Sequence, residues 1–368
     1  MQKRTGVERI LKALKLQQPD VVPHFDGVDK KVRDAIMRNS TASYEDFIEY
    51  LDVDGILISD RVYTWSYEPL GLSKTGRQLK RCQWGATIQF TAEETGIPME
   101  PAIKSFPELD RYVPPDPNLP WRYEWLKQVV KRFKGQKAII VGCTDVFDIA
   151  KENLLGDEQY YSSMVKNPSF IDEVNEIALT YQLQYVKSCI DIGADVIFVN
   201  GDWAMTQGPM VSRKFTERYI APSFKKIVEY AHSRRIPVIK HTDGNIWPIY
   251  DIIIHAGADG IHPIDPMAGM DIGEAKAKFG DRVCLCGNVS CAFSLVSGTV
   301  EEVKQETKEV IRKGGKGGGF ICMSSNSIHS SVKPENYVAM VETIREFGRY
   351  PLEDHFGNLV MAGSGERT

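Results

Sequence analysis

The sequence predicts an α/β fold, a (β/α)8 barrel, and two observations support the prediction. Short apolar runs recur along the 368-residue chain, and amphipathic helical stretches separate most of them. The runs are continuously apolar, as expected of parallel strands buried on both faces. Eight runs favour a closed barrel over the alternative, an open doubly wound sheet. The predicted strands are 21–25, 55–59, 139–143, 196–200, 237–241, 260–264, 283–287 and 319–323.

The chain is expected to begin with a helix that precedes the barrel. Thr5 and Glu8 have the spacing of a capping box, in which each side chain accepts a hydrogen bond from the other residue's backbone amide. Apolar residues follow at helical spacing, and Pro19 ends the pattern. The sequence therefore predicts an N-terminal helical extension.

Residues 69–120 interrupt the alternation of strands and helices. They contain Gly, Pro and the mixed polar and apolar run 82–90. We interpret this segment as a hairpin and loop inserted after the second strand of a single domain, 1–368. Because loops that follow barrel strands lie at the catalytic face, the insertion is expected to cover the site.

The composition excludes several classes of protein. Hydrophobic residues make up 42% of the chain and charged residues 26%, with a net charge of -4, as in ordinary globular proteins. No long run of one charge indicates a nucleic-acid or anionic-membrane partner. No apolar stretch approaches the roughly 18 residues of a membrane helix. Seven cysteines without a C-x-x-C pair indicate reduced thiols in a cytoplasmic protein.

The candidate site lies where the predicted strands end, because barrel enzymes form their active sites there. Carboxylates, imidazoles, amides and aromatic rings gather at these ends, and few residues are basic. Such a set suits a neutral or weakly acidic organic molecule and not a polyphosphate or polycarboxylate. The candidates are Asp60, Tyr63, Asp145, Phe147, Asn200, Asp202, Trp203, Met205, Gln207, His241, Asp243, His262, Cys286 and Asn326.

His241-Thr242-Asp243 is the sharpest local signal. Residues i and i+2 of a strand point to the same side, so His241 and Asp243 can face one metal ion or one substrate. An open catalytic zinc site needs three protein ligands. A hydrogen-bonded His–Asp pair, or a substrate role without metal, is the alternative. His262 lies in a proline-flanked turn, where a structural role and a site role are equally open.

Several segments together resemble one known superfamily. They are the opening pattern of 9–23, GDWAMTQGP at 201–209, HTDGN at 241–245, GNV at 287–289 and PEN at 334–336. These are similar to elements of the uroporphyrinogen decarboxylase superfamily, which also contains corrinoid-dependent methyltransferases. The resemblance runs over almost the whole chain and implies a barrel.

Departures from the decarboxylase pattern favour the methyltransferase branch. One decarboxylase feature is retained, because Asp60 aligns with the aspartate that the decarboxylases use to hold pyrrole nitrogens. Two features are not: the arginine-rich stretch after their first strand is replaced by PHFDG at 23–27, and Ser290 replaces a family aspartate. Without those cations, buried propionates would lack partners, at a cost of about several kcal/mol each.

A second departure concerns zinc. The thiol-methylating branch binds zinc through H-x-C and a later cysteine, and here Asp243 and Asn326 stand at the two cysteine positions. Oxygen ligands are harder than thiolates. Zinc therefore remains only a less favoured alternative. The resemblance then implies an enzyme that moves a methyl group from a small O-methylated compound, with an aryl methyl ether favoured, to the cobalt of a separate corrinoid protein.

The implied reaction assigns roles to the candidates. Cobalt(I) would attack the methyl carbon, and His241 or Asp243 would assist the departing oxygen directly or through a metal. Rings such as Trp203 and Phe147 would sandwich the substrate. Two other classes stay open: a decarboxylase acting through Asp60, and a non-catalytic tetrapyrrole- or corrinoid-binding protein. A homodimer is also left open. Tyr63 and Met205 are also expected to contact the substrate's ring. The polar residues expected to hold the substrate are Asn200, Asp202, His262 and Asn326.

Overall fold

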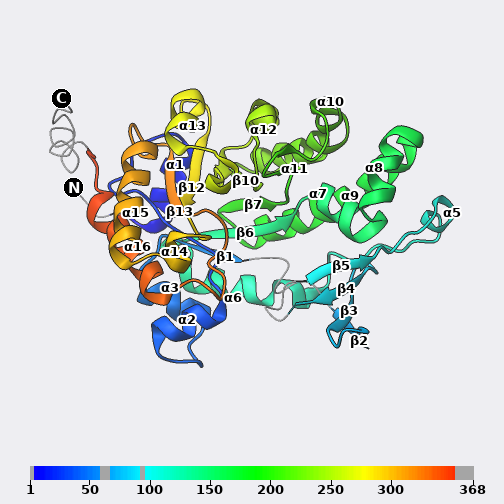
Figure 1. Ribbon diagram of the computed structural model, residues 1–368, viewed down its shortest axis with the longest axis horizontal. Helices are drawn as coiled ribbons and strands as arrows, with labels where there is room; N and C mark the ends of the chain where they lie inside the picture. The colour runs from blue at the N-terminus through cyan, green and yellow to red at the C-terminus, as the bar shows by residue number, and fades with distance from the viewer. Residues whose placement is uncertain (1–3, 59–66, 92–95, 353–368) are drawn as a thin grey trace, which may run out of the picture.

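The computed structural model describes residues 4–58, 67–91 and 96–352. Seven parallel strands form its centre, with helices packed around them (Figure 1). Their order in the sheet is their order in the chain, and this topology confirms the predicted (β/α)8-barrel class. The strands are β1 (Gly55–Ile58), β6 (Ala138–Thr144), β7 (Val196–Asn200), β10 (Val238–His241), β11 (Gly260–His262), β12 (Cys284–Val289) and β13 (Phe320–Ser324).

The first predicted strand, 21–25, is an extended segment and not a regular strand. It still lies between β13 and β1, because the Cys322 amide donates to the Pro23 carbonyl (3.0 Å) and the Asp54 amide to the His24 carbonyl (2.9 Å). Pro23 has no amide to donate, and the His24 amide bonds to the Asp54 carboxylate (3.0 Å) instead of a strand. Backbone pairing on this side of the barrel is therefore sparse, although the segment spans the gap.

Helix α1 (Gly6–Leu14) closes the amino-terminal end of the barrel. The capping box of Thr5 and Glu8 is present, as predicted. Ile10 and Leu14 are buried in one cluster with side chains that fill the barrel interior, including Phe25 and Phe198. The N-terminal helix is therefore part of the core, which explains its one-sided apolar pattern.

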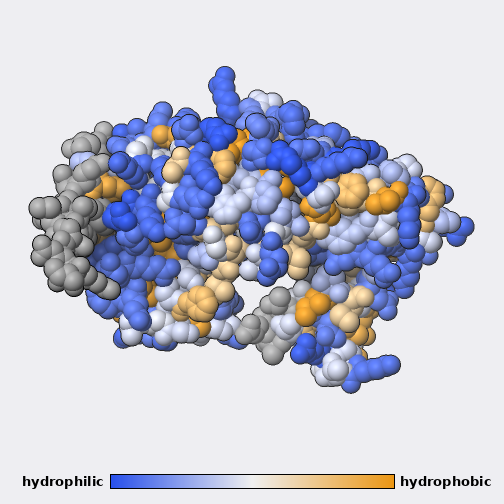
Figure 2. Space-filling model, turned by 45° about the horizontal axis from the view of Figure 1, so that its top comes forward, coloured by the Kyte–Doolittle hydropathy of each residue, from blue (hydrophilic) through white to orange (hydrophobic). Residues whose placement is uncertain are grey.

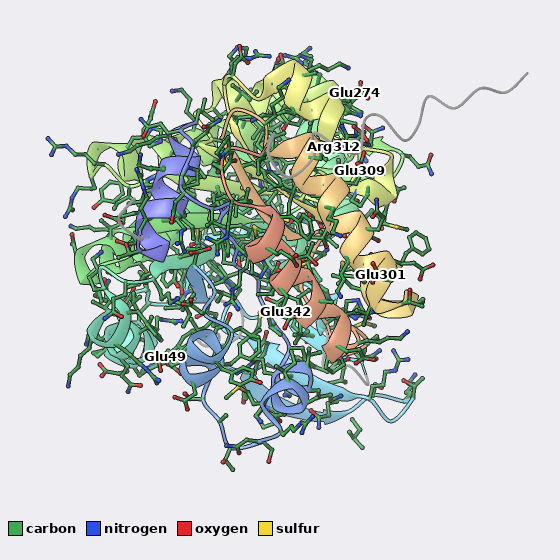
Figure 3. The ribbon with its side chains drawn as sticks, turned by 90° about the vertical axis from the view of Figure 1, so that its left-hand side faces the viewer. Glu49, Glu274, Glu301, Glu309, Arg312 and Glu342 are labelled. Carbon is green, nitrogen blue, oxygen red and sulfur yellow. The ribbon has the colours of Figure 1, made fainter. Side chains whose placement is uncertain are left out.

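The outer helices bury one face each and expose charged residues on the other. In α15 (Val300–Gly314), Val303 and Ile311 are buried, and Figure 3 shows Glu301, Glu309 and Arg312 on its outer surface.

No helix among the described residues is long and apolar enough to cross a bilayer. The other main helices are α2 (Lys30–Met37), α3 (Tyr44–Tyr50), α6 (Glu124–Phe133), α8 (Asp157–Lys166), α9 (Pro168–Ile192), α11 (Ala221–Ser233), α12 (Tyr250–His255), α13 (Ile272–Phe279) and α16 (Pro334–Phe347).

The insertion after β1 is larger than the single hairpin that the sequence predicts. It contains a four-stranded antiparallel sheet in the order β2 (Tyr67–Leu72), β3 (Gln78–Cys82), β4 (Thr87–Phe90) and β5 (Gly96–Glu100). The sheet projects from the barrel at the lower right of Figure 1. Figure 2 shows apolar patches on this part of the surface, where the edge strands expose Leu72 and Met99.

Candidate active site

A small pocket of about 70 Å³ lies at the carboxyl ends of the barrel strands. Imidazoles, amides and one carboxylate line it together with apolar side chains. A larger hollow of about 790 Å³ lies at the opposite end of the barrel, between α1 and α16, and holds neither His241 nor His262. The smaller pocket is therefore the candidate active site. Its lining is Asp26, Gly27, Leu57, Phe198, Asn200, His241, His262, Met323, Asn326 and Ser327.

Two imidazoles meet at the ends of neighbouring strands. His241 ends β10, and its register partner on β11 is His262. The two Nδ1 atoms are 2.7 Å apart. His262 is buried, and its Nε2 lies 3.2 Å from the carbonyl oxygen of Ser324 on β13. Burial, followed by the nearby His241, lowers the pKa of His262 well below its usual value, so this ring is neutral.

Carboxylates surround the other nitrogen of His241. Its Nε2 lies 3.7 Å from Asp243 Oδ1 and 3.9 Å from Asp202 Oδ1. The Asp243 amide donates to Asp202 Oδ1 (2.8 Å), and Asn326 Nδ2 donates to Asp243 Oδ2 (2.5 Å). Burial raises the pKa of Asp243 to about 8, and the charges of Asp202 and Asp265 add to the shift. Three carboxylates are thus held together here with an imidazole.

The residues at this point fit a divalent cation. One ligand atom each from Asp202, His241 and Asp243 lie within 4.8 Å of one another. Asp243 Oδ1 is buried and has no hydrogen-bond partner among the described residues, which is costly unless a further group occupies the space. One imidazole and two carboxylates are ligands that zinc and other first-row divalent ions accept.

Asp26 also lines the pocket, although it is outside the set of predicted site residues. Its side chain is buried, and burial raises its pKa to about 8. Ser324 donates to Asp26 Oδ1 from its amide (3.1 Å) and from its hydroxyl (2.8 Å). The sequence signal was its position, one residue after the first predicted strand.

Three predicted site residues lie behind the pocket and not in it. Trp203 is completely buried, and its Nε1 donates to Asp145 Oδ2 (3.0 Å). Asp145 also binds the buried ammonium of Lys240 (2.6 Å). Phe147 packs against Tyr160 in the core. These side chains support the loops after β6 and β7, so the structure does not place Trp203 or Phe147 as rings that sandwich a substrate.

Other predicted residues are dispersed. Met205 and Gln207 are exposed on the loop that follows β7, and Met205 retains 62% of its accessible surface. Cys286 is buried in the barrel interior below the pocket. Asp60 and Tyr63 lie outside the described residues. No described residue of the inserted sheet lines the pocket, so the expected cover over the site is not seen there.

The fold and the strand-end cluster define an α/β-barrel protein with an acidic, imidazole-containing site. The family model described as "Uroporphyrinogen decarboxylase (URO-D)" matches residues 83–347. The chain therefore belongs to the uroporphyrinogen decarboxylase family, an enzyme family, as the sequence motifs predicted.

Individual relatives are distant. Uroporphyrinogen decarboxylase from Coxiella burnetii is 27% identical over 185 residues, which cover 50% of this chain and 49% of that protein. The chain thus spans about half the length of this relative. Uroporphyrinogen decarboxylase from Psychromonas ingrahamii is 25% identical over 265 residues, covering 70% of this chain and 73% of the relative.

A solved structure has the same fold. The methyltransferase from Methanosarcina mazei matches with a TM-score of 0.71 and 19% identity, over 94% of this chain and 99% of that one. This likeness supports the barrel architecture over nearly the full length of both chains.

Proposed function

We propose that this chain is a methyltransferase that moves a methyl group from a small O-methylated compound, such as an aryl methyl ether, to the cobalt of a separate corrinoid protein. The observation that carries the proposal is the charge of the pocket. None of the described residues that line it is Lys or Arg. A polycarboxylate would therefore bury its charges there without partners, whereas a neutral ether would not.

Pocket size supports a small substrate. The described residues enclose about 70 Å³, below the roughly 300–1,000 Å³ of sites that bury drug-sized ligands. Leu57, Phe198 and Met323 supply an apolar wall, and Asn200 and Asn326 supply amides on the same pocket. This combination suits a compact molecule that has both an apolar body and an ether oxygen.

The reaction needs help at the oxygen that leaves. The bond between the methyl carbon and the oxygen breaks, the electron pair stays on the oxygen, and cobalt(I) of the partner forms the new bond to carbon. A divalent cation held by Asp202, His241 and Asp243 would supply positive charge to this oxygen. The chain's amides orient the ether so that its methyl group faces the open end of the barrel.

The deciding experiment replaces His241 and follows transfer to the corrinoid. Purified His241→Ala is expected to lose at least about 100-fold in methyl transfer from an aryl methyl ether to cobalt(I), read by the corrinoid's absorbance. His255→Ala, which changes an exposed histidine on α12, is the matched control and should react like the wild type. Transfer by His241→Ala at the wild-type rate refutes the role.

Decarboxylation remains the second candidate because of the relatives. The curated proteins from Coxiella burnetii and Psychromonas ingrahamii are both named uroporphyrinogen decarboxylase. In this chain the buried, protonated Asp26 would serve as a proton donor beside the pocket. Release of carbon dioxide from a porphyrinogen, without any corrinoid protein, would favour this function over methyl transfer.

A further inference from the structure

We propose that the hollow at the amino-terminal end of the barrel binds an organic molecule that carries about two negative charges, on phosphate or carboxylate groups. The hollow lies between α1 and α16, toward the left of Figure 1, and encloses about 790 Å³. That volume is in the range of sites that bury small organic ligands, roughly 300–1,000 Å³. No described residue lines both this hollow and the candidate active site, so the proposal does not depend on methyl transfer.

Basic side chains outnumber acidic ones around this hollow. Its described lining includes four arginines and three aspartates. The aspartates already have partners within the chain. Arg9 bonds Asp20 (2.9 Å) and Asp54 (3.0 Å), and Lys137 bonds Asp52 (2.5 Å). With Lys137 counted, five cations accompany three carboxylates, which leaves an excess of two positive charges for a further group.

The excess charge lies on the other three arginines of the lining, Arg4, Arg345 and Arg349. Within the part of the chain that the structure describes, none of their guanidinium groups forms an ion pair or a side-chain hydrogen bond. Arg345 is in the last turn of α16, Arg349 follows the end of that helix, and Arg4 precedes α1. A guanidinium group binds phosphate and carboxylate through two parallel N–H donors. A dianion in the hollow would therefore supply the acceptors that these arginines lack.

Backbone hydrogen bonds hold one wall of the hollow in place. The Val22 amide donates to the Gly348 carbonyl (2.8 Å), and the Tyr350 amide donates to the Asp20 carbonyl (3.0 Å). The backbone on both sides of Arg349 is thus tied to the segment before the barrel. A wall that exists before the ligand arrives lowers the entropy cost of binding.

The inner surface of the hollow is apolar. Val22, Val53, Val341 and Ile344 line it, and each side chain is at most 3% exposed. An inorganic ion would leave this surface in contact with water, whereas the hydrocarbon part of an organic ligand would cover it. Exposed arginines around a buried apolar surface therefore favour an organic anion. The candidate active site has the opposite character, because no described residue of its lining is Lys or Arg.

Isothermal titration calorimetry of the whole chain tests the site with three probes that share one ring system. Naphthyl phosphate carries a phosphate, naphthalene dicarboxylate carries two carboxylates, and naphthol is neutral. At neutral pH and low salt, at least one of the two dianions should bind with a Kd below about 1 mM, and the one that binds identifies the acidic group. Naphthol should bind at least about tenfold more weakly. Absence of binding by both dianions, or equal binding of naphthol, overturns the proposal.

A pair of substitutions tests the arginines. Arg345→Gln combined with Arg349→Gln removes two unpaired cations and should weaken binding of the dianion by at least about tenfold. Arg77→Gln combined with Arg111→Gln removes the same charge from exposed positions elsewhere and should leave the affinity unchanged. Wild-type affinity in the first variant, or an equal loss in the second, overturns the proposal.

His241→Ala separates the hollow from the candidate active site. This variant should bind the dianion as the wild type does, and loss of binding would place the anion in the other pocket and overturn the proposal. The dianion should also raise the Tm of the wild type and of His241→Ala, because a ligand that binds only the folded state stabilises it. An equal rise in the variant that lacks Arg345 and Arg349 would contradict the site. The same unfolding curves show that each variant is folded.

Discussion

The two ends of the barrel treat their carboxylates in opposite ways. At the amino-terminal end, Arg9 bonds both Asp20 (2.9 Å) and Asp54 (3.0 Å). At the carboxyl-terminal end, Asp202 and Asp243 lie beside the imidazole of His241, and no Lys or Arg among the described residues forms an ion pair with either. One end neutralises its acids within the chain, and the other leaves negative charge for a further group.

This difference agrees with the proposal that the carboxyl-terminal end carries the chemistry and the amino-terminal end contributes stability. Burial raises the pKa of Asp243 to about 8, which means that the folded chain resists its ionisation in the absence of a cation. Barrel enzymes in general place chemistry at the carboxyl ends of the strands and stability at the other end. Substitutions of charged residues at the two ends should therefore have opposite effects on the free energy of unfolding.

The largest effect on stability is expected from Arg9→Met. The Asp54 carboxylate would remain buried without its cation, and breaking such a pair costs roughly 3–5 kcal/mol. Denaturant unfolding should show this loss. Arg218→Met breaks an exposed pair with Asp172 and should cost no more than about 1 kcal/mol. Equal losses in the two variants would remove the distinction between a buried and an exposed pair.

The opposite result is expected from Asp243→Asn. At neutral pH the Asp243 carboxyl, whose pKa is raised to about 8, must take up a proton on folding, whereas an amide need not. The metal-free variant should therefore be more stable than the wild type by about 1 kcal/mol or more. It should also lose most of its affinity for Co²⁺, because one carboxylate ligand is gone. Lower stability together with unchanged Co²⁺ affinity would contradict the view that this end is prepared for a cation.

A further expected effect is a pH dependence of stability that involves Asp26. Its pKa is about 8 in the folded chain and near 3.8 when unperturbed. The folded state therefore holds more protons than the unfolded state between about pH 4 and 8, and this group's contribution to stability falls as the pH rises through that window.

Asp26→Asn removes this titration. The difference in Tm between the variant and the wild type should increase in the variant's favour from pH 5 to pH 8. Differential scanning calorimetry at several pH values measures this difference. Asp281→Asn, at an exposed carboxylate, controls for a general charge effect. A gap that is constant with pH would show that Asp26 titrates normally.

Strand positions were largely predictable because buried parallel strands are continuously apolar. Strand β7 matches its predicted range, 196–200, and β6 differs from its prediction by one residue at each end. The segment 21–25 has the same composition, but the partner of the His24 amide is a carboxylate thirty positions away. Nothing in the local sequence pattern indicates that this amide donates to a side-chain carboxylate and not to the carbonyl of a neighbouring strand.

The site was predictable only where strand geometry alone decides. His241 ends β10 and Asp243 follows two residues later, and Asn326 meets Asp243 because both follow strand ends. Trp203 follows a strand end too, yet its large ring is buried against Phe224. Periodicity cannot tell whether a loop side chain turns toward the mouth or toward the outer helices, since tertiary packing decides this.

The bond between Asp26 and Ser324 joins positions that are 298 residues apart. It forms where the first segment of the barrel meets the last strand, so it cannot exist while the ribosome is still making β13. Ser324 also presents the carbonyl on which His262 depends. During synthesis this seam is therefore closed last, and a chain truncated before β13 would lack the carbonyl group that the His262 ring contacts.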